Sequence, residues 1–148
     1  LNGTGSLAVT GSTISMNGAG KTIDPNGKTL NNLTIANTSG TITLQNSDLT
    51  LGTSGVLTVN SGGGSLTLGN NRFLTLSATS GTSLVLNGAI SCSSCQGLVY
   101  ESTTAFPTSG DISTGRLIMN PIAGNQTLSA RNYGDVTLLM DAGPFVKR

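Results

Sequence analysis

Cys92 and Cys95, in the segment SCSSCQG, are the pair of side chains with the most reactive chemistry in this sequence. A structural zinc site takes four ligands, and the chain has two cysteines and no histidine. A thioredoxin-type site needs a helix after the cysteines, which the residues SSCQGLVY do not favour. The alternatives that remain are a disulfide that holds a turn and two reduced thiols. We predict the disulfide, which would fit an oxidising compartment.

Three charged residues, Asp24, Asp48 and Arg72, are evenly spaced along the sequence. Without histidine the usual hydrolase triads are absent, and a glycosidase needs two facing carboxylates. Asp24 and Asp48 would approach each other only if the chain winds with this same spacing. We therefore predict a charge ladder along one corner, in which Asp48 and Arg72 form an exposed ion pair contributing about 0–1 kcal/mol.

Two further segments resemble ligand-binding loops without completing them. GAGKT at residues 18–22 lacks the full spacing of a phosphate-binding loop, and IDPNG follows it where a helix should begin. SGGGSLTLG, from residue 61, resembles a calcium-binding nonapeptide but has no aspartate at the ligand position. We assign no catalytic residue, no cofactor and no metal site, and we expect a protein that is not an enzyme.

The composition restricts the class of protein. The 148 residues suggest one domain, and 9% of them are charged, against about 25% in an ordinary soluble protein. The formal net charge is +1, and the lysines and arginines are scattered, so we expect no nucleic acid partner. No apolar run approaches the roughly 18 residues of a membrane span.

A short phrase recurs at short and nearly regular intervals. It consists of an apolar residue, then usually a threonine, and then another apolar residue. Three intervals make a larger repeat, as from Leu33 to Leu57 and from Leu57 to Leu84, and a fixed period of this size indicates a repeat architecture. Similar phrases at Leu7 and Ile14 precede Leu33 and Ile42 by about one such repeat, so we assign them to an earlier coil. The phrases begin at Leu33, Ile42, Leu49, Leu57, Leu66, Leu74 and Leu84.

Each phrase predicts a short strand, because its apolar residues alternate with a period of two and favour a pleated surface. Gly, Ser, Asn and Asp separate the phrases and suit tight turns. We predict an all-β parallel β-helix with about three strands per coil, its threonines outward and its first apolar residues stacked as a core: Leu33 with Leu57 and Leu84, Ile42 with Leu66, and Leu49 with Leu74. An antiparallel sandwich is the alternative, but it has no reason to repeat its loop lengths in threes.

The repeat fades near Cys92, so we divide the chain into a solenoid at residues 1–97 and a C-terminal segment at residues 98–148. Residues 101–148 carry eight of the thirteen charged residues and three of the four prolines. This segment is expected to be a cap, a small β subdomain or an arm that pairs with another copy. An uncapped solenoid end exposes unpaired backbone groups, so we expect a homo-oligomer or a head-to-tail homopolymer.

Outward threonine columns have one functional alternative, because flat threonine ladders bind ice in some solenoids. The segment TIT at residues 41–43 is the one clear pair of threonines, and the other phrases present a single threonine. We interpret the threonines as solubilising residues that favour strands.

The phrases NLTI, GTITL, DLTL and GVLTV give residues 7–90 a resemblance to bacterial cell-surface β-solenoids, namely autotransporter passenger domains and filamentous-haemagglutinin-type adhesins. This resemblance implies an extracellular or cell-surface location, an adhesive or scaffolding role, and contacts with cell surfaces or glycans. We expect a non-enzymatic structural protein that assembles into a surface filament or layer. The alternatives are a fragment of a longer surface adhesin and a carbohydrate-active β-helix protein.

Overall fold

The computed structural model describes residues 11–92, 94–120, 128 and 133–139, in which the chain forms short β-strands joined by turns. Sheet A contains β1 (Thr13–Met16), β4 (Asn32–Ile35), β7 (Leu57–Val59) and β10 (Leu84–Leu86). Sheet B contains β2 (Lys21–Ile23), β5 (Gly40–Leu44), β8 (Gly64–Leu68), β11 (Ala89–Cys92) and β13 (Asp111–Ser113). Sheet C contains β3 (Thr29–Leu30), β6 (Leu49–Leu51), β9 (Phe73–Leu76), β12 (Gly97–Tyr100), β14 (Arg116–Met119) and β15 (Asp135–Leu138).

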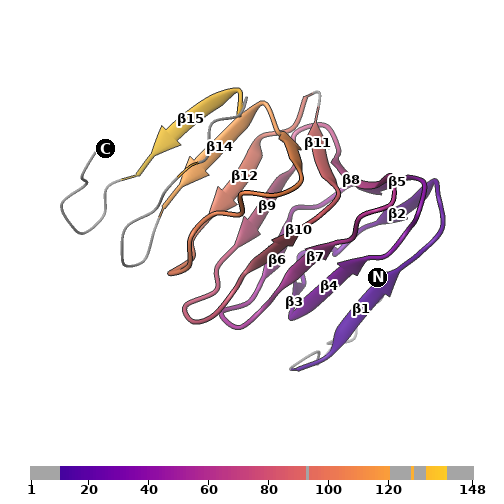
Figure 1. Ribbon diagram of the computed structural model, residues 1–148, viewed down its shortest axis with the longest axis horizontal. Coiled ribbons are helices and arrows are strands. Elements are labelled where there is room, and N and C mark those ends of the chain that lie inside the picture. The colour runs from indigo at the N-terminus through magenta and orange to yellow at the C-terminus, as the bar shows by residue number, and fades with distance from the viewer. Residues whose placement is uncertain (1–10, 93, 121–127, 129–132, 140–148) are drawn as a thin grey trace.

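From β1 to β12 successive strands visit sheets A, B and C in turn, and β13, β14 and β15 add to sheets B, C and C. Every described strand pairs in parallel with its counterpart one coil away. The result is a β-solenoid of about four turns with three strands per coil. Figure 1 shows the strands side by side along the molecule, from β1 at one end to β15 at the other. The predicted fold class is confirmed, and the antiparallel sandwich is excluded.

The core consists of stacked aliphatic columns inside the tube. Leu33 pairs with Leu57 and Leu57 with Leu84, and none of the three is more than 3% exposed. The columns that pair Ile42 with Leu66 and Leu49 with Leu74 are completely buried. Between them the outward residues are half-buried, as alternation on a pleated strand requires. The stacking predicted from the repeat is therefore observed in all three sheets.

The corner between sheets B and C contains a left-handed asparagine or glycine in several coils. Asn26, Asn46 and Asn71 occupy this corner in the first three coils, with φ of 52°, 61° and 57°. Asparagine tolerates this conformation better than other residues with a side chain. Gly134 follows at the same corner before β15, with φ of 67°, and a Cβ on it would lie 2.6 Å from the carbonyl oxygen of Gly115.

The first coil is shorter than the repeat predicts. Ile14 pairs with Leu33, whereas the spacing of the phrases had suggested Ile42 as its counterpart. That assignment was wrong because two strands of this coil, β2 with the sequence KTI and β3 with the sequence TL, do not match the repeated phrase. The phrase at Leu7 lies outside the described residues.

The boundary placed after residue 97 does not mark an end of the winding. β13 pairs with β11, β14 with β12, and β15 with β14, so sheets B and C continue beyond it. The repeat fades in the sequence because these coils are shorter: Leu98 pairs with Leu117, and Leu117 with Val136, each across fewer residues than separate Leu33 from Leu57. The irregular residues 101–110 come after β12 in the chain and take the place of a further sheet A strand beside β10. There the Ser109 hydroxyl donates a hydrogen bond of 2.7 Å to the Leu86 carbonyl.

Aromatic side chains fill the tube where this irregular segment packs. The rings of Tyr100 and Phe106 are 4.9 Å apart and those of Phe106 and Tyr133 are 5.9 Å apart, both edge to face. All three side chains are buried, and the Tyr100 hydroxyl lies 3.2 Å from the carbonyl oxygen of Ala105. The aromatic cluster therefore anchors residues 101–110 to the last coils.

The described residues form strands, turns and bends only, so none of them makes a helix long and apolar enough to cross a membrane.

We expect Leu57→Ala to lower the free energy of unfolding by about 2–5 kcal/mol, because the cavity would lie between two buried leucines. Thr58→Ala, on the outward side of the same strand, should change it by less than about 1 kcal/mol. Urea unfolding followed by circular dichroism measures both values. Equal losses for the two variants would contradict the assignment of inward and outward residues.

Candidate functional site

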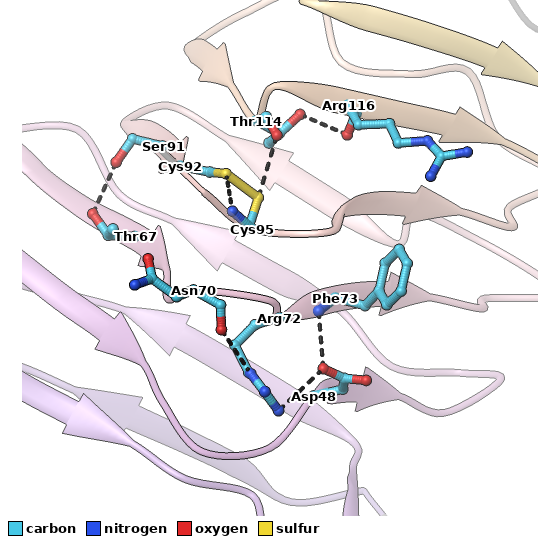
Figure 2. The surroundings of a disulfide bond; sticks show 10 residues. All are labelled: Asp48, Thr67, Asn70, Arg72, Phe73, Ser91, Cys92, Cys95, Thr114 and Arg116. Atoms are coloured by element: carbon cyan, nitrogen blue, oxygen red, sulfur yellow. Dashed lines mark hydrogen bonds and ion pairs between the residues drawn. A yellow bond between two sulfur atoms is a disulfide. The ribbon is translucent and has the colours of Figure 1, made fainter.

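A disulfide joins Cys92, at the end of β11, to Cys95, before β12, at the corner between sheets B and C (Figure 2). The Cys95 backbone N–H donates a hydrogen bond of 2.9 Å to the Cys92 sulfur. The Cys95 sulfur lies 3.3 Å from the carbonyl oxygen of Thr114 in the next coil. A disulfide sulfur carries no hydrogen, so the latter is a packing contact. The bond holds the corner of the fourth coil. At the equivalent corner, each of the first three coils has an asparagine in the left-handed conformation.

Arg72 links the corners of the second and third coils. Its guanidinium lies 3.7 Å from the Asp48 carboxylate and donates a hydrogen bond of 2.8 Å to the Asn46 carbonyl. Asp48 also accepts a hydrogen bond of 3.0 Å from the backbone N–H of Phe73. The predicted ion pair is therefore present, as Figure 2 shows. Because the Asp48 side chain is 50% exposed, water screens the pair, which contributes about 0–1 kcal/mol at most.

Asp24 links the first and second coils through a different set of partners. Its carboxylate accepts hydrogen bonds from the Ser47 hydroxyl at 2.6 Å, the Asn46 side-chain amide at 3.0 Å and the Asn26 backbone N–H at 3.0 Å. These bonds, that from Ser47 foremost, lower the pKa of the Asp24 carboxyl below its ordinary value.

The three charged residues lie at one corner, but they do not form the regular ladder predicted from their spacing. Ile23 pairs with Leu44, so Gln45 is the counterpart of Asp24, and Asp48 lies further along the chain. The error has the same cause as that for Ile14, namely the short first coil. Asp24 and Asp48 therefore have separate hydrogen-bond partners and do not form the facing pair that glycoside hydrolysis uses. Within the described part of the chain, no three His, Cys, Asp or Glu residues gather as a metal site would require.

Two columns of mainly hydroxyl-bearing residues form a hydroxyl face on the outside of sheet B, although Ala89 and Asp111 continue the column of Thr41 and Ser65. The hydroxyls of Thr41 and Ser65 are 3.1 Å apart, and those of Thr67 and Ser91 are 2.8 Å apart. The segment SLT of β8 stacks on the segment TIT of β5, so the paired hydroxyls extend beyond the single case found in the sequence. The threonines alone indicate a single pair, whereas serine presents the same hydroxyl group and extends it. Each of the two columns therefore contains one pair of hydroxyls that bond to each other across adjacent coils.

The last described strand leaves apolar side chains uncovered. Val136, Leu138 and Leu139 are 42%, 53% and 44% exposed. In the coil below, the register partners of Val136 and Leu138 are Leu117 and Met119, which are 0% and 1% exposed. β15 therefore continues the inward columns, and among the described residues no further rung pairs with it. No motif in the sequence signals this feature, because it depends on which coil lies at the end of the stack.

The opposite end shows a weaker form of the same feature. On β1, the inward residues Ile14 and Met16 are only partly buried, whereas their register partners Leu33 and Ile35 are completely buried. Within the described residues β1 pairs only with β4, and β15 only with β14. We take these two strand edges together as the candidate functional site.

Comparison with known protein families, with curated proteins and with solved structures finds no match for this chain.

Replacing both Cys92 and Cys95 by serine should lower the free energy of unfolding by about 2 kcal/mol, since the disulfide closes only a short loop. Intact mass spectrometry of the unfolded, unreduced wild type should show no thiol that reacts with iodoacetamide. A protein that takes up the reagent at both cysteines without prior reduction would contradict the disulfide.

Asp24 should make stability depend on acid pH. A carboxyl whose pKa is lowered by folding stabilises the protein above its unfolded pKa, and this contribution is lost as the pH falls through the folded value. Between about pH 5 and pH 2, wild type should therefore lose more free energy of unfolding than Asp24→Asn. Urea titrations at a series of pH values test this. Parallel pH profiles for the two proteins would show that the Ser47 and Asn46 hydrogen bonds do not stabilise the charged form.

Proposed function

We propose that this protein is a non-enzymatic structural subunit that acts outside the cell and assembles head to tail through the ends of its β-solenoid. One observation carries the proposal: on β15 the inward positions Val136 and Leu138 are about half exposed, although the same columns are buried in the coils below. An edge that combines apolar side chains with unpaired backbone groups favours the addition of another strand.

The two ends of the solenoid are different surfaces, so a contact between them is heterologous. Such a contact forms a closed ring only if the rotation between copies brings the last copy back to the first. If it does not, the contact generates an open filament. In a parallel solenoid each added rung runs along the same axis as the rungs before it. Assembly through the ends would therefore extend the tube and leave the hydroxyl face of sheet B on the outside.

Two features support a location outside the cell. The Cys92–Cys95 disulfide fits an oxidising compartment. The repeated phrases of residues 7–90 resemble those of autotransporter passenger domains and filamentous-haemagglutinin-type adhesins, which supports an adhesive or scaffolding role at a cell surface. Contact with glycans is part of this proposal, and the hydroxyl columns of sheet B would be the face that makes it.

The same observation favours one alternative function. In a longer surface adhesin, a further coil of the same polypeptide would cover Val136 and Leu138, and the segment described here would serve as a spacer in the stalk. The two proposals differ in what covers β15, which is a second molecule in the first and the same polypeptide in the second.

We expect the purified chain to form filaments or oligomers whose size increases with protein concentration. Leu138→Lys should abolish this assembly while leaving the far-ultraviolet circular dichroism unchanged, because it places a charge in the contact. Val85→Lys is the matched control, since Val85 is 37% exposed and lies on the outward side of sheet A. Sedimentation velocity and negative-stain electron microscopy provide the measurements.

A chain that remains monomeric at every concentration would overturn the assembly proposal. Assembly of Leu138→Lys to the same extent as wild type would show that β15 is not the contact surface.

A further inference from the structure

Among the described residues at the N-terminal end of the solenoid, sheet A leaves both inward apolar residues of its first strand under-buried. In sheet B, the inward positions of β2 are Ile23 and the exposed Lys21, whose register partner on β5 is buried. A charged residue at an inward position disfavours the addition of another strand to β2. In the first coil Ile23 of β2 is 5% exposed and Leu30 of β3 is 1% exposed, so these two positions are already covered. Ile14 and Met16 of β1 lie at equivalent inward positions but are only partly buried. The edge that can still gain from an added rung is therefore β1.

At the C-terminal end, among the described residues, sheet C is the sheet whose last inward side chains are exposed. Residues 101–110 lie against the edge of β10 in sheet A. The inward residues of β10, Leu84 and Leu86, are accordingly only 3% and 1% exposed. In sheet B, Ile112 of β13 is 5% exposed. Val136 and Leu138 of β15, in contrast, are 42% and 53% exposed. The two edges that lack cover thus belong to different sheets.

The two edges match each other residue by residue. β1 has the sequence Thr-Ile-Ser-Met and β15 the sequence Asp-Val-Thr-Leu, so both have four residues and both alternate a polar with an apolar side chain. We propose that β1 of one copy adds in parallel to β15 of a second copy, with Ile14 beside Val136 and Met16 beside Leu138. This inference rests on the head-to-tail assembly proposed above and specifies its contact.

The charges near the two ends favour a second copy as the partner. Among the described residues, Lys21, Asp24 and Lys28 give the first coil a net charge of +1, whereas Asp111, Arg116 and Asp135 give the last coils a net charge of −1. Opposite charges across a contact steer the partners together and disfavour the contact of two like ends. A junction of β1 with β15 brings the lysine-bearing end of one copy to the aspartate-bearing end of the next.

The junction fixes the symmetry of the filament. Because sheet A of one copy continues sheet C of the other, each copy is rotated by one sheet position, which is one third of a turn in a three-sided tube. Sheet C contributes six strands, so successive copies would be displaced by about 29 Å at about 4.8 Å per rung. Stacking without rotation would instead place sheet C on sheet C.

Pairs of single-cysteine variants distinguish the two junctions. In the proposed register Ser15 of one copy lies beside Thr137 of the next, so a mixture of Ser15→Cys and Thr137→Cys should form a covalent dimer with a short bifunctional maleimide. The matched control is a mixture of Thr29→Cys and Thr137→Cys, because Thr29 and Thr137 share one outward column of sheet C and would meet in unrotated stacking. We expect at least ten times more dimer from the first mixture than from the second.

Helical reconstruction from electron micrographs provides an independent check, and we expect a rotation of one third of a turn for each copy. Preferential cross-linking of the Thr29 mixture, or a filament without this rotation, would overturn the β1–β15 junction and leave head-to-tail assembly standing. Absence of both cross-links from a protein that sediments as a monomer would overturn both proposals.

Discussion

A strand as short as β7 (Leu57–Val59) cannot satisfy its backbone N–H and C=O groups by itself, and it is too short for a free-standing hairpin. In this protein the coils above and below supply the missing partners, so each strand is stable only within the stack. Other features follow from that constraint. The inward residues must be aliphatic in every coil, because each one is in contact with its counterparts at about 4.8 Å along the tube. The corners must turn sharply, which explains why asparagine adopts a left-handed conformation at the corner between sheets B and C.

The corner contacts determine how the coils are aligned once they stack. Ser47 and Asn46 bind Asp24 of the coil below, Arg72 binds Asn46 and Asp48, and the disulfide takes this place in the fourth coil. These contacts lie within one seam, so the polar groups with the most chemistry in the sequence act as structural links. Because each coil stacks by pairing its strands with those of the next coil, the edge of β15 is also able to accept another strand.

The fold could be predicted from the sequence because the repeated phrase carries both the strand period and the coil period. Leu33, Leu57 and Leu84 stand at equivalent places in three phrases, and alternation alone directs them into the tube. The first and last coils could not be aligned in this way. β3 consists of Thr29 and Leu30 alone, and residues 101–110 replace a strand, so the spacing there depends on turns whose length no periodic pattern records. The Cys92–Cys95 disulfide followed from local spacing and the Asp48–Arg72 ion pair from the coil period, whereas the exposed edge of β15 depends on the order of coils in space.

The central claim is that neighbouring coils pair in parallel with the register seen in sheet A. Through-space contacts in solid-state NMR spectra test it directly, because they can be measured on the free and on the assembled chain. We predict contacts between the Cα atoms of Thr34 and Thr58 and between those of Thr58 and Val85, which are register partners in adjacent coils. Contacts that join Leu33 to Val59 and Ile35 to Leu57 would indicate antiparallel pairing and would contradict the solenoid together with the assembly that depends on it.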